Sequence, residues 1–290
     1  MEPSFLKDKV VLVTGGTGSF GRYFADAALK SELKKLIIFS RDEYKQFEMK
    51  KEISDPRIRF FLGDVRDLSR LQRAFTEVDV VVHAAALKQV PALEYNPLEA
   101  VKTNIVGTQN VIDAALDGKV EKVLLISTDK AVNPVSLYGA TKLCAEKLFI
   151  AANAYRGFAK HPFFSAVRYG NVIGSRGSLV ESLLRQQEME IMLTHADMTR
   201  FWMKLDEAAS LVMNALGVMK GGEIFVPKIP SMKVSDLVAV LRPDSEIRTV
   251  GIRPGEKIHE ALLTADEVRR ARDIGKYYIV EPAKEHSWWQ

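Results

Sequence analysis

Short apolar runs alternate with longer amphipathic stretches along the first 170 residues. The apolar runs lie at residues 10–13, 36–39, 58–61, 78–82, 123–126 and 163–167. They contain few polar positions, which is typical of strands buried on both faces. Stretches with helical periodicity lie between them, at residues 20–29, 68–75, 97–116 and 139–155. The alternation predicts an α/β fold, a doubly wound parallel sheet covered by helices on both faces.

The pattern changes beyond residue 170, where glycine, proline and arginine cluster in GSRGS, GGEIFVPKIPS and GIRPGEK. Such loop-rich sequence is typical of a lobe at the carboxyl edge of an open α/β sheet, where ligands bind. We therefore expect a Rossmann-type domain at residues 1–170, to which later segments return. A smaller lobe at residues 171–290 is expected to bind mainly substrate.

Composition and charge narrow the classes of protein. The 290 residues are 47% hydrophobic and 27% charged, and the formal net charge is +4. Acids and bases are interspersed, which argues against a nucleic-acid-binding protein. No apolar run reaches the roughly 18 residues of a membrane span, and the charged N-terminus predicts no signal peptide. The single cysteine, Cys144, indicates a reducing cytoplasm, and the five scattered histidines predict no metal site.

A glycine-rich segment, TGGTGSFG, follows the first predicted strand and opens the first predicted helix. In this context glycines let the backbone approach a pyrophosphate, and the helix N-terminus offers free N–H groups. A purely structural turn is the alternative. The segment predicts a nicotinamide dinucleotide site with contacts from Gly15, Thr17, Gly18, Ser19, Phe20 and Gly21.

The end of the second predicted strand indicates which dinucleotide binds. NAD sites have Asp or Glu there, which binds the ribose 2′-OH. This chain has Ser40 and Arg41 at that place and Lys45 a turn later, and these residues attract a 2′-phosphate. We therefore expect NADP, with Asp42 capping the next helix. After the third strand, Asp64 either contacts the adenine or forms a simple turn.

Tyr138 and Lys142 are four residues apart, on one face of a predicted helix. A tyrosine is mostly protonated at neutral pH. A cation about 4 Å away contributes on the order of 4 kcal/mol at an effective dielectric near 20. We therefore expect Lys142 to lower the pKa of Tyr138 enough to make it a base. A solvated helix face is the alternative, but the strand, the Ser-Thr pair and the glycine loop before it favour catalysis.

TGGTGSFG, STDK and YGATK together resemble the extended short-chain dehydrogenase/reductase superfamily, the group that acts on nucleotide sugars. AALKQVPALEYNP, RYGNVIGSRGS, MTRFW, GGEIFVPKIPSMK and GIRPGEK more narrowly resemble the inverting UDP-N-acetylglucosamine 4,6-dehydratases. These enzymes start pathways to pseudaminic acid and to certain L-sugars. The resemblance runs from residue 9 to 260, and the tail from Ala265, with Trp288 and Trp289, matches less clearly. It implies an NADP-dependent hydro-lyase that forms dimers or hexamers.

The resemblance implies five catalytic residues. Thr128 would polarise the 4-OH of the sugar, and Tyr138 and Lys142 would complete the oxidation at C4. Elimination of water then needs a base at C5 and an acid at the 6-OH, and we assign Lys130 and Asp129 to these roles. Burial favours the neutral lysine and the protonated aspartic acid, whereas their mutual attraction opposes both. A surface ion pair is the alternative, and the division of roles is a hypothesis.

The remaining expected contacts follow from the same resemblance. Further cofactor contacts are expected from Val65, Ala84, Ala85, Lys88 and Asn104, besides Tyr138 and Lys142. Further substrate contacts are expected from Lys88, Asn171, Arg200, Arg253 and Glu256, besides Thr128 and Tyr138. Among these, an arginine suits a bidentate contact with a diphosphate, and a glutamate suits the uridine ribose. A solvated surface charge is the alternative for the charged residues.

Two other functions stay open. A nucleotide-sugar 4-epimerase or C5-epimerase would share the fold, the cofactor and Tyr138. Its reaction leaves the mass of the sugar unchanged, whereas a dehydratase removes one water. A non-catalytic NADP-sensing regulator would have a broken catalytic set, yet Thr128, Tyr138 and Lys142 are all present.

Overall fold

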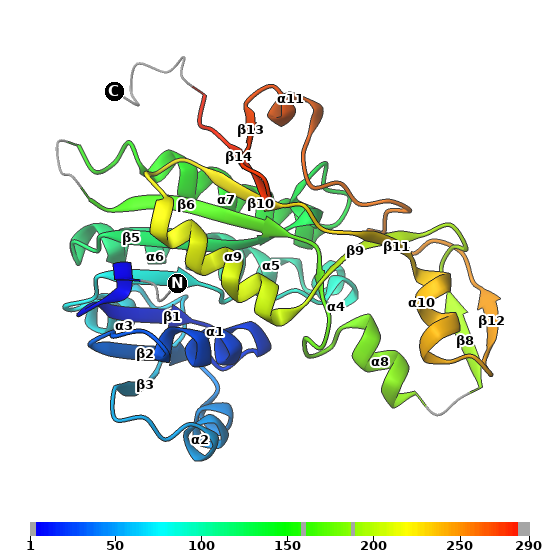
Figure 1. Ribbon diagram of the computed structural model, residues 1–290, viewed down its shortest axis with the longest axis horizontal. Coiled ribbons are helices and arrows are strands. Elements are labelled where there is room, and N and C mark those ends of the chain that lie inside the picture. The colour runs from blue at the N-terminus through cyan, green and yellow to red at the C-terminus, as the bar shows by residue number, and fades with distance from the viewer. Residues whose placement is uncertain (1–3, 158–160, 187–188, 284–290) are drawn as a thin grey trace.

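The computed structural model describes residues 4–157, 161–186 and 189–283, so Trp288 and Trp289 lie outside the described residues. Its centre is a nine-stranded sheet in the order β13-β14-β10-β6-β5-β4-β1-β2-β3 (Figure 1). Six strands are those expected: β1 (Val10–Thr14), β2 (Lys35–Ser40), β3 (Ile58–Leu62), β4 (Val80–His83), β5 (Lys122–Thr128) and β6 (Phe163–Tyr169). They pair in parallel in the order 3-2-1-4-5-6, which is the Rossmann order. The predicted fold class is confirmed.

Three later strands join the same sheet. Strand β10 (Ile224–Pro227) is parallel to β6, whereas β14 (Tyr277–Val280) and β13 (Ala271–Asp273) continue the sheet antiparallel. The chain after residue 170 therefore contributes both to this sheet and to an outer lobe.

Helices cover both faces of the sheet (Figure 1). Helices α1 (Ser19–Leu29) and α9 (Leu205–Val218) pack on one face, and α3 (Leu68–Ala74), α6 (Gly107–Asp117) and α7 (Leu137–Ala152) pack on the other. In β1, Val11 and Val13 face the first layer, and Val10 and Leu12 face the second. Burial on both faces explains why the strands are continuous apolar runs in the sequence.

Some helices differ from the expectation. The stretch at residues 97–116 is divided into α5 (Pro97–Ala100), a π-helix η2 (Val101–Val106) and α6. Helix α2 (Glu43–Glu52) is the helix that Asp42 was expected to cap. Its extent was not predicted, because only Gln46 and Met49 of its ten residues are buried and no apolar stripe is visible in the sequence. Helix α4 (Val90–Tyr95) was not expected, since its six residues contain a proline and are too few to show a period.

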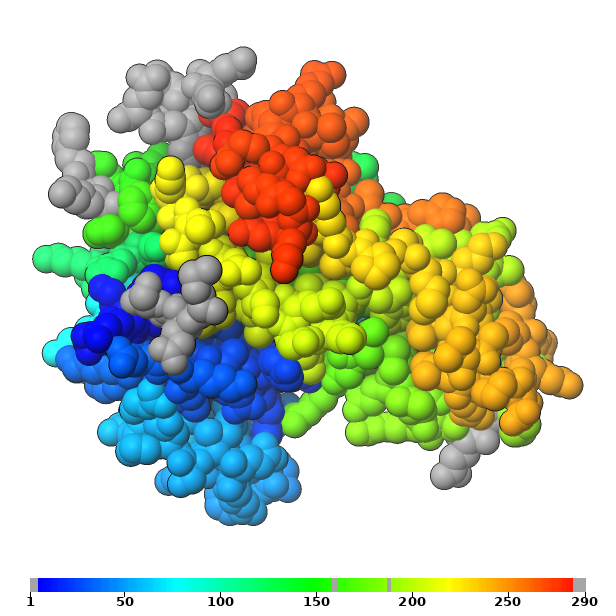
Figure 2. Space-filling view, in the orientation of Figure 1, coloured from blue at the N-terminus to red at the C-terminus, as the bar shows by residue number. Residues whose placement is uncertain are grey.

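The outer lobe has its own apolar core. One small sheet contains β7 (Asn171–Val172), β9 (Thr199–Met203) and β11 (Ser231–Lys233), and another contains β8 (Glu190–Leu193) and β12 (Glu246–Thr249). Helices α8 (Leu179–Arg185) and α10 (Val234–Leu241) pack with these sheets around Leu183, Ile191, Trp202 and Val238. Figure 2 shows the lobe projecting from one side of the body. No helix in the described part of the chain is long and apolar enough to cross a bilayer.

Candidate active site

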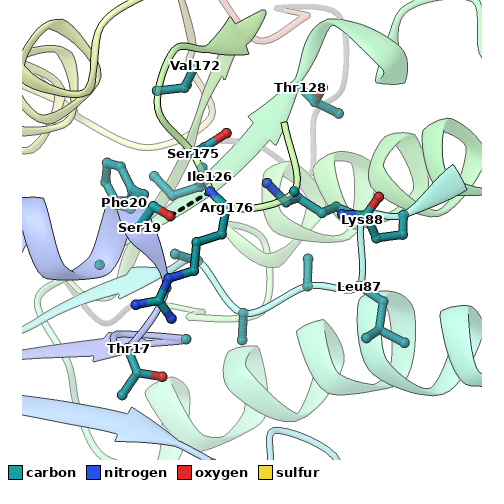
Figure 3. Close-up of a pocket in the computed structure, with 18 of the residues that line it drawn as sticks. Thr17, Ser19, Phe20, Leu87, Lys88, Ile126, Thr128, Val172, Ser175 and Arg176 are labelled. Carbon is teal, nitrogen blue, oxygen red and sulfur yellow. Dashed lines mark hydrogen bonds between the residues drawn. The ribbon is translucent and has the colours of Figure 1, made fainter. Parts of the chain in front are cut away.

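A cleft of about 650 Å³ lies between the carboxyl ends of the parallel strands and the outer lobe. The loops after β1, β2, β4 and β5 line one side, and the segment at residues 169–179 lines the other (Figure 3). The strand order reverses between β1 and β4, which is where open α/β sheets bind ligands.

The glycine loop packs closely on its surroundings and leads into a helix N-terminus without a side-chain cap. Gly15 has a φ of +65°, and a Cβ there would lie 2.8 Å from the backbone of Ala85. A Cβ on Gly21 would lie 2.5 Å from the Cα of Gly16, so α1 packs closely on the loop. Both positions therefore require glycine. Gly18 is the N-cap of α1 and provides no side-chain cap, so N–H groups of the first turn are available to an anion.

The two cations expected at a 2′-phosphate contact carboxylates instead. Lys45 Nζ lies 2.7 Å from Asp42 Oδ2, and Arg41 Nη1 lies 3.7 Å from Asp64 Oδ2. Asp42 caps α2 as expected, because it accepts a hydrogen bond from the Lys45 amide. Burial opposes ionisation of Asp64, but hydrogen bonds from Arg66 lower the pKa of this carboxyl. The cleft is lined by all of these groups except Arg66.

Arg176 is a cation of the cleft that the sequence analysis did not identify. Its backbone amide donates a hydrogen bond to Ser19 Oγ, and its side chain extends toward the loop that contains Thr17 (Figure 3). Its guanidinium has no hydrogen bond or ion pair with the residues that the structure describes. Gly174 and Gly177, with φ of +78° and +68°, flank the segment and let it turn across the cleft. The motif GSRGS predicted a loop, but not what this loop faces.

The catalytic candidates meet where β5 ends and α7 begins. Ser136 caps α7 by accepting a hydrogen bond from the Gly139 amide, which sets Tyr138 in the first turn. Thr128 ends β5, and Lys142 follows Tyr138 by one turn. Thr128, Tyr138 and Lys142 all line the cleft, as do Lys130, Lys88 and Asn171. The structure thus brings these residues together.

The pKa of Tyr138 is shifted in the direction opposite to the expected one. Burial, reinforced by the charge of Asp129, raises the pKa of Tyr138, although a hydrogen bond with Thr128 acts against this. Lys142 Nζ donates to the carbonyl of Ile126 at 2.7 Å, and burial lowers its pKa to about 8. The spacing predicted that the two residues share a helix face, but it did not predict how deeply they are buried.

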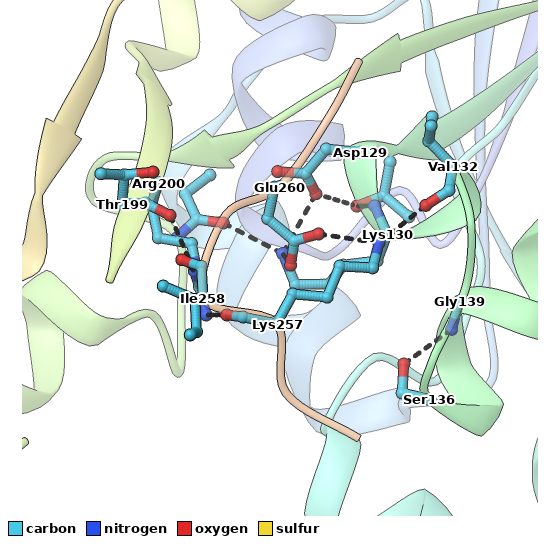
Figure 4. Close-up of polar contacts among 12 residues, drawn as sticks. Asp129, Lys130, Val132, Ser136, Gly139, Thr199, Arg200, Lys257, Ile258 and Glu260 are labelled. Carbon is cyan, nitrogen blue, oxygen red and sulfur yellow. Dashed lines mark hydrogen bonds and ion pairs between the residues drawn. The ribbon is translucent and has the colours of Figure 1, made fainter. Parts of the chain in front are cut away.

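Asp129 and Lys130 form a part-buried pair (Figure 4). Lys130 Nζ lies 3.0 Å from Asp129 Oδ1 and 3.4 Å from Asn171 Oδ1. Thr128 Oγ1 donates to the same Asp129 oxygen at 2.9 Å. Asp129 is fully buried, and its Oδ2 has no partner among the described residues. The pair is therefore not a solvated surface pair.

Two predicted ligands instead hold backbone segments. Asn104 is buried and bonds both the amide and the carbonyl of Leu87, so it shapes the loop that leads to Lys88. Arg200 is 8% exposed, and its guanidinium donates to the carbonyls of Thr199, Lys257 and Ile258. A buried guanidinium needs such acceptors, and the motif MTRFW did not reveal that backbone carbonyls provide them.

The two ligands predicted from GIRPGEK lie in one loop. Arg253 is exposed, and its amide donates to Glu256 Oε2 at 3.3 Å. Gly255 in this loop has a φ of +80°, and a Cβ there would lie 3.1 Å from Ser136 Cβ and 3.2 Å from Glu94 Oε1. The loop therefore packs near the start of α7, outside the lining of the main cleft.

The sheet order, the glycine loop and the Tyr138–Lys142 pair together define a Rossmann-type protein of the extended short-chain dehydrogenase/reductase class. A family model described as "Polysaccharide biosynthesis protein" matches residues 11–282, and the chain belongs to this family.

Named relatives include more than one activity. The chain is 49% identical to "UDP-N-acetylglucosamine 4,6-dehydratase (inverting)" of Campylobacter jejuni subsp. jejuni serotype O:2, over 95% of this chain and 83% of that protein. It is 41% identical to "UDP-glucose 4-epimerase" of Rickettsia canadensis, over 94% of this chain and 83% of that protein. The X-ray structure of Pen from Bacillus thuringiensis is 41% identical, with a TM-score of 0.93 over 96% of this chain and 90% of that one. The resemblance to the inverting dehydratases is thus confirmed.

Proposed function

We propose that this protein is an inverting UDP-N-acetylglucosamine 4,6-dehydratase with NADP as its cofactor. The observation that carries the proposal is the Asp129–Lys130 pair: Lys130 lines the cleft with Thr128 and Tyr138, and its Nζ lies 3.0 Å from the carboxylate of Asp129, which is buried behind the lining. Oxidation at C4 needs no second acid and base, whereas elimination of water needs both. The named activity of the Campylobacter jejuni relative supports the same reaction.

The cleft suits a nicotinamide dinucleotide. Gly15, Gly18 and Gly21 of the glycine loop line it, and the hydroxyls of Thr103 and Ser127 are buried there without a partner among the described residues. A nicotinamide held beside the glycine loop would supply the hydride transfer that oxidation at C4 and reduction at C6 require. Arg41 and Arg176 supply positive charge for NADP. When NADP binds, the Arg41 guanidinium would leave the Asp64 carboxylate and bind the 2′-phosphate.

We assign the removal of the 4-OH proton to Tyr138. Because burial disfavours its phenolate, Tyr138 needs a nearby cation when it loses its proton. Lys142, one helical turn away, is the cation we assign to this role. Thr128 at the end of β5 would hold the 4-OH in place.

A single proton shift from Lys130 to Asp129 would give the neutral amine and the carboxylic acid that elimination requires. When the Lys130 ammonium passes a proton to Asp129, the products are a neutral amine and a neutral carboxylic acid, and the net charge is unchanged. Lys130 then takes the C5 proton, Asp129 gives its proton to the 6-OH, and water leaves. Lys130 is then an ammonium again and Asp129 a carboxylate. For inversion, the proton that later adds to C5 must approach from the opposite face.

Product analysis tests the proposal. The purified protein is incubated with UDP-N-acetylglucosamine in deuterated water without added cofactor, and the product is studied by mass spectrometry and NMR. We expect loss of one water, a 4-ketone, deuterium at C5 and inverted configuration there. Nucleotide released from the denatured protein is expected to be NADP, and NAD alone would contradict the cofactor assignment.

A nucleotide-sugar epimerase is the second candidate, and the Rickettsia canadensis relative supports it. An epimerase would give a product that has lost no water in the same experiment, whereas a regulator that only binds NADP would give no product. The cytoplasmic location and the assembly into dimers or hexamers stay predictions.

A further inference from the structure

Lys130 contacts a second carboxylate, that of Glu260. Glu260 Oε1 lies 3.4 Å from Lys130 Nζ, and only 3% of the Glu260 side chain is exposed. Figure 4 shows this contact beside the Asp129 pair. The Lys130 side chain is 23% exposed and lines the cleft, so its ammonium faces both the cleft and two buried carboxylates.

Glu260 is held in place from two sides. Lys257 Nζ lies 3.0 Å from Glu260 Oε2 and also donates to the carbonyl of Val132 at 2.7 Å, in the loop after β5. Arg200 in β9 donates to the carbonyls of Lys257 and Ile258, at 3.0 and 3.1 Å. The segment that contains Glu260 is thus held by contacts with both the sheet domain and the outer lobe (Figure 4).

Charged groups of both signs surround Lys130 and Glu260. The charged or titratable groups that face Lys130 and Glu260 are Asp129, Tyr138, Arg200 and Lys257. Burial opposes ionisation of Glu260, but Lys130, Lys257 and Arg200 together lower the pKa of this carboxyl. Glu260 is therefore a carboxylate. Its carboxylate oxygens lie 3.4 Å from the Lys130 ammonium and 3.0 Å from the Lys257 ammonium.

We propose that Glu260 is a positioning residue for Lys130. Its carboxylate holds the lysine beside Asp129 and, together with Lys257, sets the pH range in which the Asp129–Lys130 pair carries the single proton that elimination uses. A carboxylate beside the pair favours the protonated forms, and a cation opposes them. The inference rests on the proposed dehydratase function.

The test measures, as a function of pH, how fast C5-deuterated UDP-N-acetylglucosamine loses its label to water, because Lys130 removes the C5 proton of this substrate. Oxidation by Tyr138 is followed separately, from the appearance of reduced cofactor. We expect Glu260→Gln to move the pH profile to lower pH by about one unit and Lys257→Met to move it to higher pH. Glu260→Asp, which keeps the charge but shortens the side chain, should lower the rate and leave the profile in place.

The matched control is Glu267→Gln. Glu267 is a part-buried carboxylate of the same C-terminal segment, but it pairs with Arg168 at 2.8 Å. Its substitution should reduce stability and leave the pH profile unchanged. Opposite shifts of Glu260→Gln and Lys257→Met cannot come from a general loss of structure. If Glu260→Gln does not fold, the Lys257→Met profile decides alone.

Two outcomes overturn the inference. One is a Glu260→Gln profile that coincides with that of the wild-type protein, and the other is a shift of both variants in the same direction. A wild-type protein that catalyses no exchange would instead contradict the proposed function. The two failures are therefore distinguishable.

Discussion

The backbone amide of Arg176 lies 2.9 Å from Ser19 Oγ and donates a hydrogen bond to it, which ties the segment after β7 to the first turn of α1. The two residues are 157 positions apart in the sequence. The contact holds the Arg176 side chain at the glycine loop (Figure 3). A dinucleotide on that loop would therefore have Arg176 as a charged neighbour.

Replacing Arg176 by Ala is expected to weaken NADP binding by about 10- to 100-fold, since a hydrogen bond to a charged group contributes roughly 1.5–3 kcal/mol. Titration of cofactor-free protein with NADPH, followed by fluorescence, measures this. Arg185→Ala is the control, because Arg185 is exposed and pairs with Glu181 on its own helix. Equal affinities of the two variants would contradict a role for Arg176.

Replacing Arg41 by Ala is expected to reduce the affinity for NADP by roughly tenfold and to leave NAD binding nearly unchanged, because one charge-assisted contact with the 2′-phosphate is lost. The Arg41–Asp64 separation of 3.7 Å indicates a weak pair that a phosphate can replace. Calorimetric titration with both dinucleotides gives the ratio, and Arg59→Ala, an exposed arginine of β3, is the control. A parallel loss for NAD would exclude a specific 2′-phosphate contact.

Lys130→Ala and Tyr138→Phe are expected to stop the reaction at different steps. In Lys130→Ala the C4 oxidation should proceed, so reduced cofactor should accumulate. The rate of deuterium exchange at C5 should fall at least a hundredfold, which is within the usual range for loss of a general base. Tyr138→Phe should abolish both signals. Lys147→Ala, an exposed lysine of α7, should abolish neither. C5 exchange that persists in Lys130→Ala would rule out Lys130 as the base.

The features that could be predicted from the sequence are local. The strands, the glycine loop and the Tyr138–Lys142 spacing each depend on residues close together in the chain, and the structure brings them to one edge of the sheet. Arg176 and Glu260 were not identified because their partners, Ser19 and Lys130, are more than a hundred residues away in the chain. No local pattern encodes such contacts.

Burial is the other property that the sequence did not reveal. It reversed the expected pKa shift of Tyr138, because desolvation of the phenol and the charge of Asp129 both raise this pKa. It also determines the role of Arg200, whose guanidinium is satisfied by backbone carbonyls instead of a ligand. Charge in a motif indicates a ligand only when the side chain faces the cleft, and orientation depends on the tertiary packing.

His83 gives a prediction for stability. Its Nδ1 lies 2.7 Å from Thr14 Oγ1, its Nε2 lies 3.1 Å from Thr108 Oγ1, and the residue is 1% exposed. Burial, together with the charge of Lys142, lowers the pKa of His83 to about 3, compared with 6.5 as the ordinary value. Between these two pH values the unfolded chain binds one more proton than the folded chain at this site. The free energy of unfolding therefore decreases as the pH falls from 6.5 toward 3.

We expect the contribution of His83 to decrease by about 1.4 kcal/mol for each pH unit below 6.5. His83→Gln removes this titration, so its free energy of unfolding should be lower than that of the wild-type protein at pH 7 but should depend less on pH in this window. Urea unfolding at a series of pH values measures both curves. His161→Gln, at an exposed position, should follow the wild-type curve. If the free energy of unfolding of His83→Gln had the same pH dependence as that of the wild-type protein, the titration of His83 would not be the cause of the loss of stability in acid.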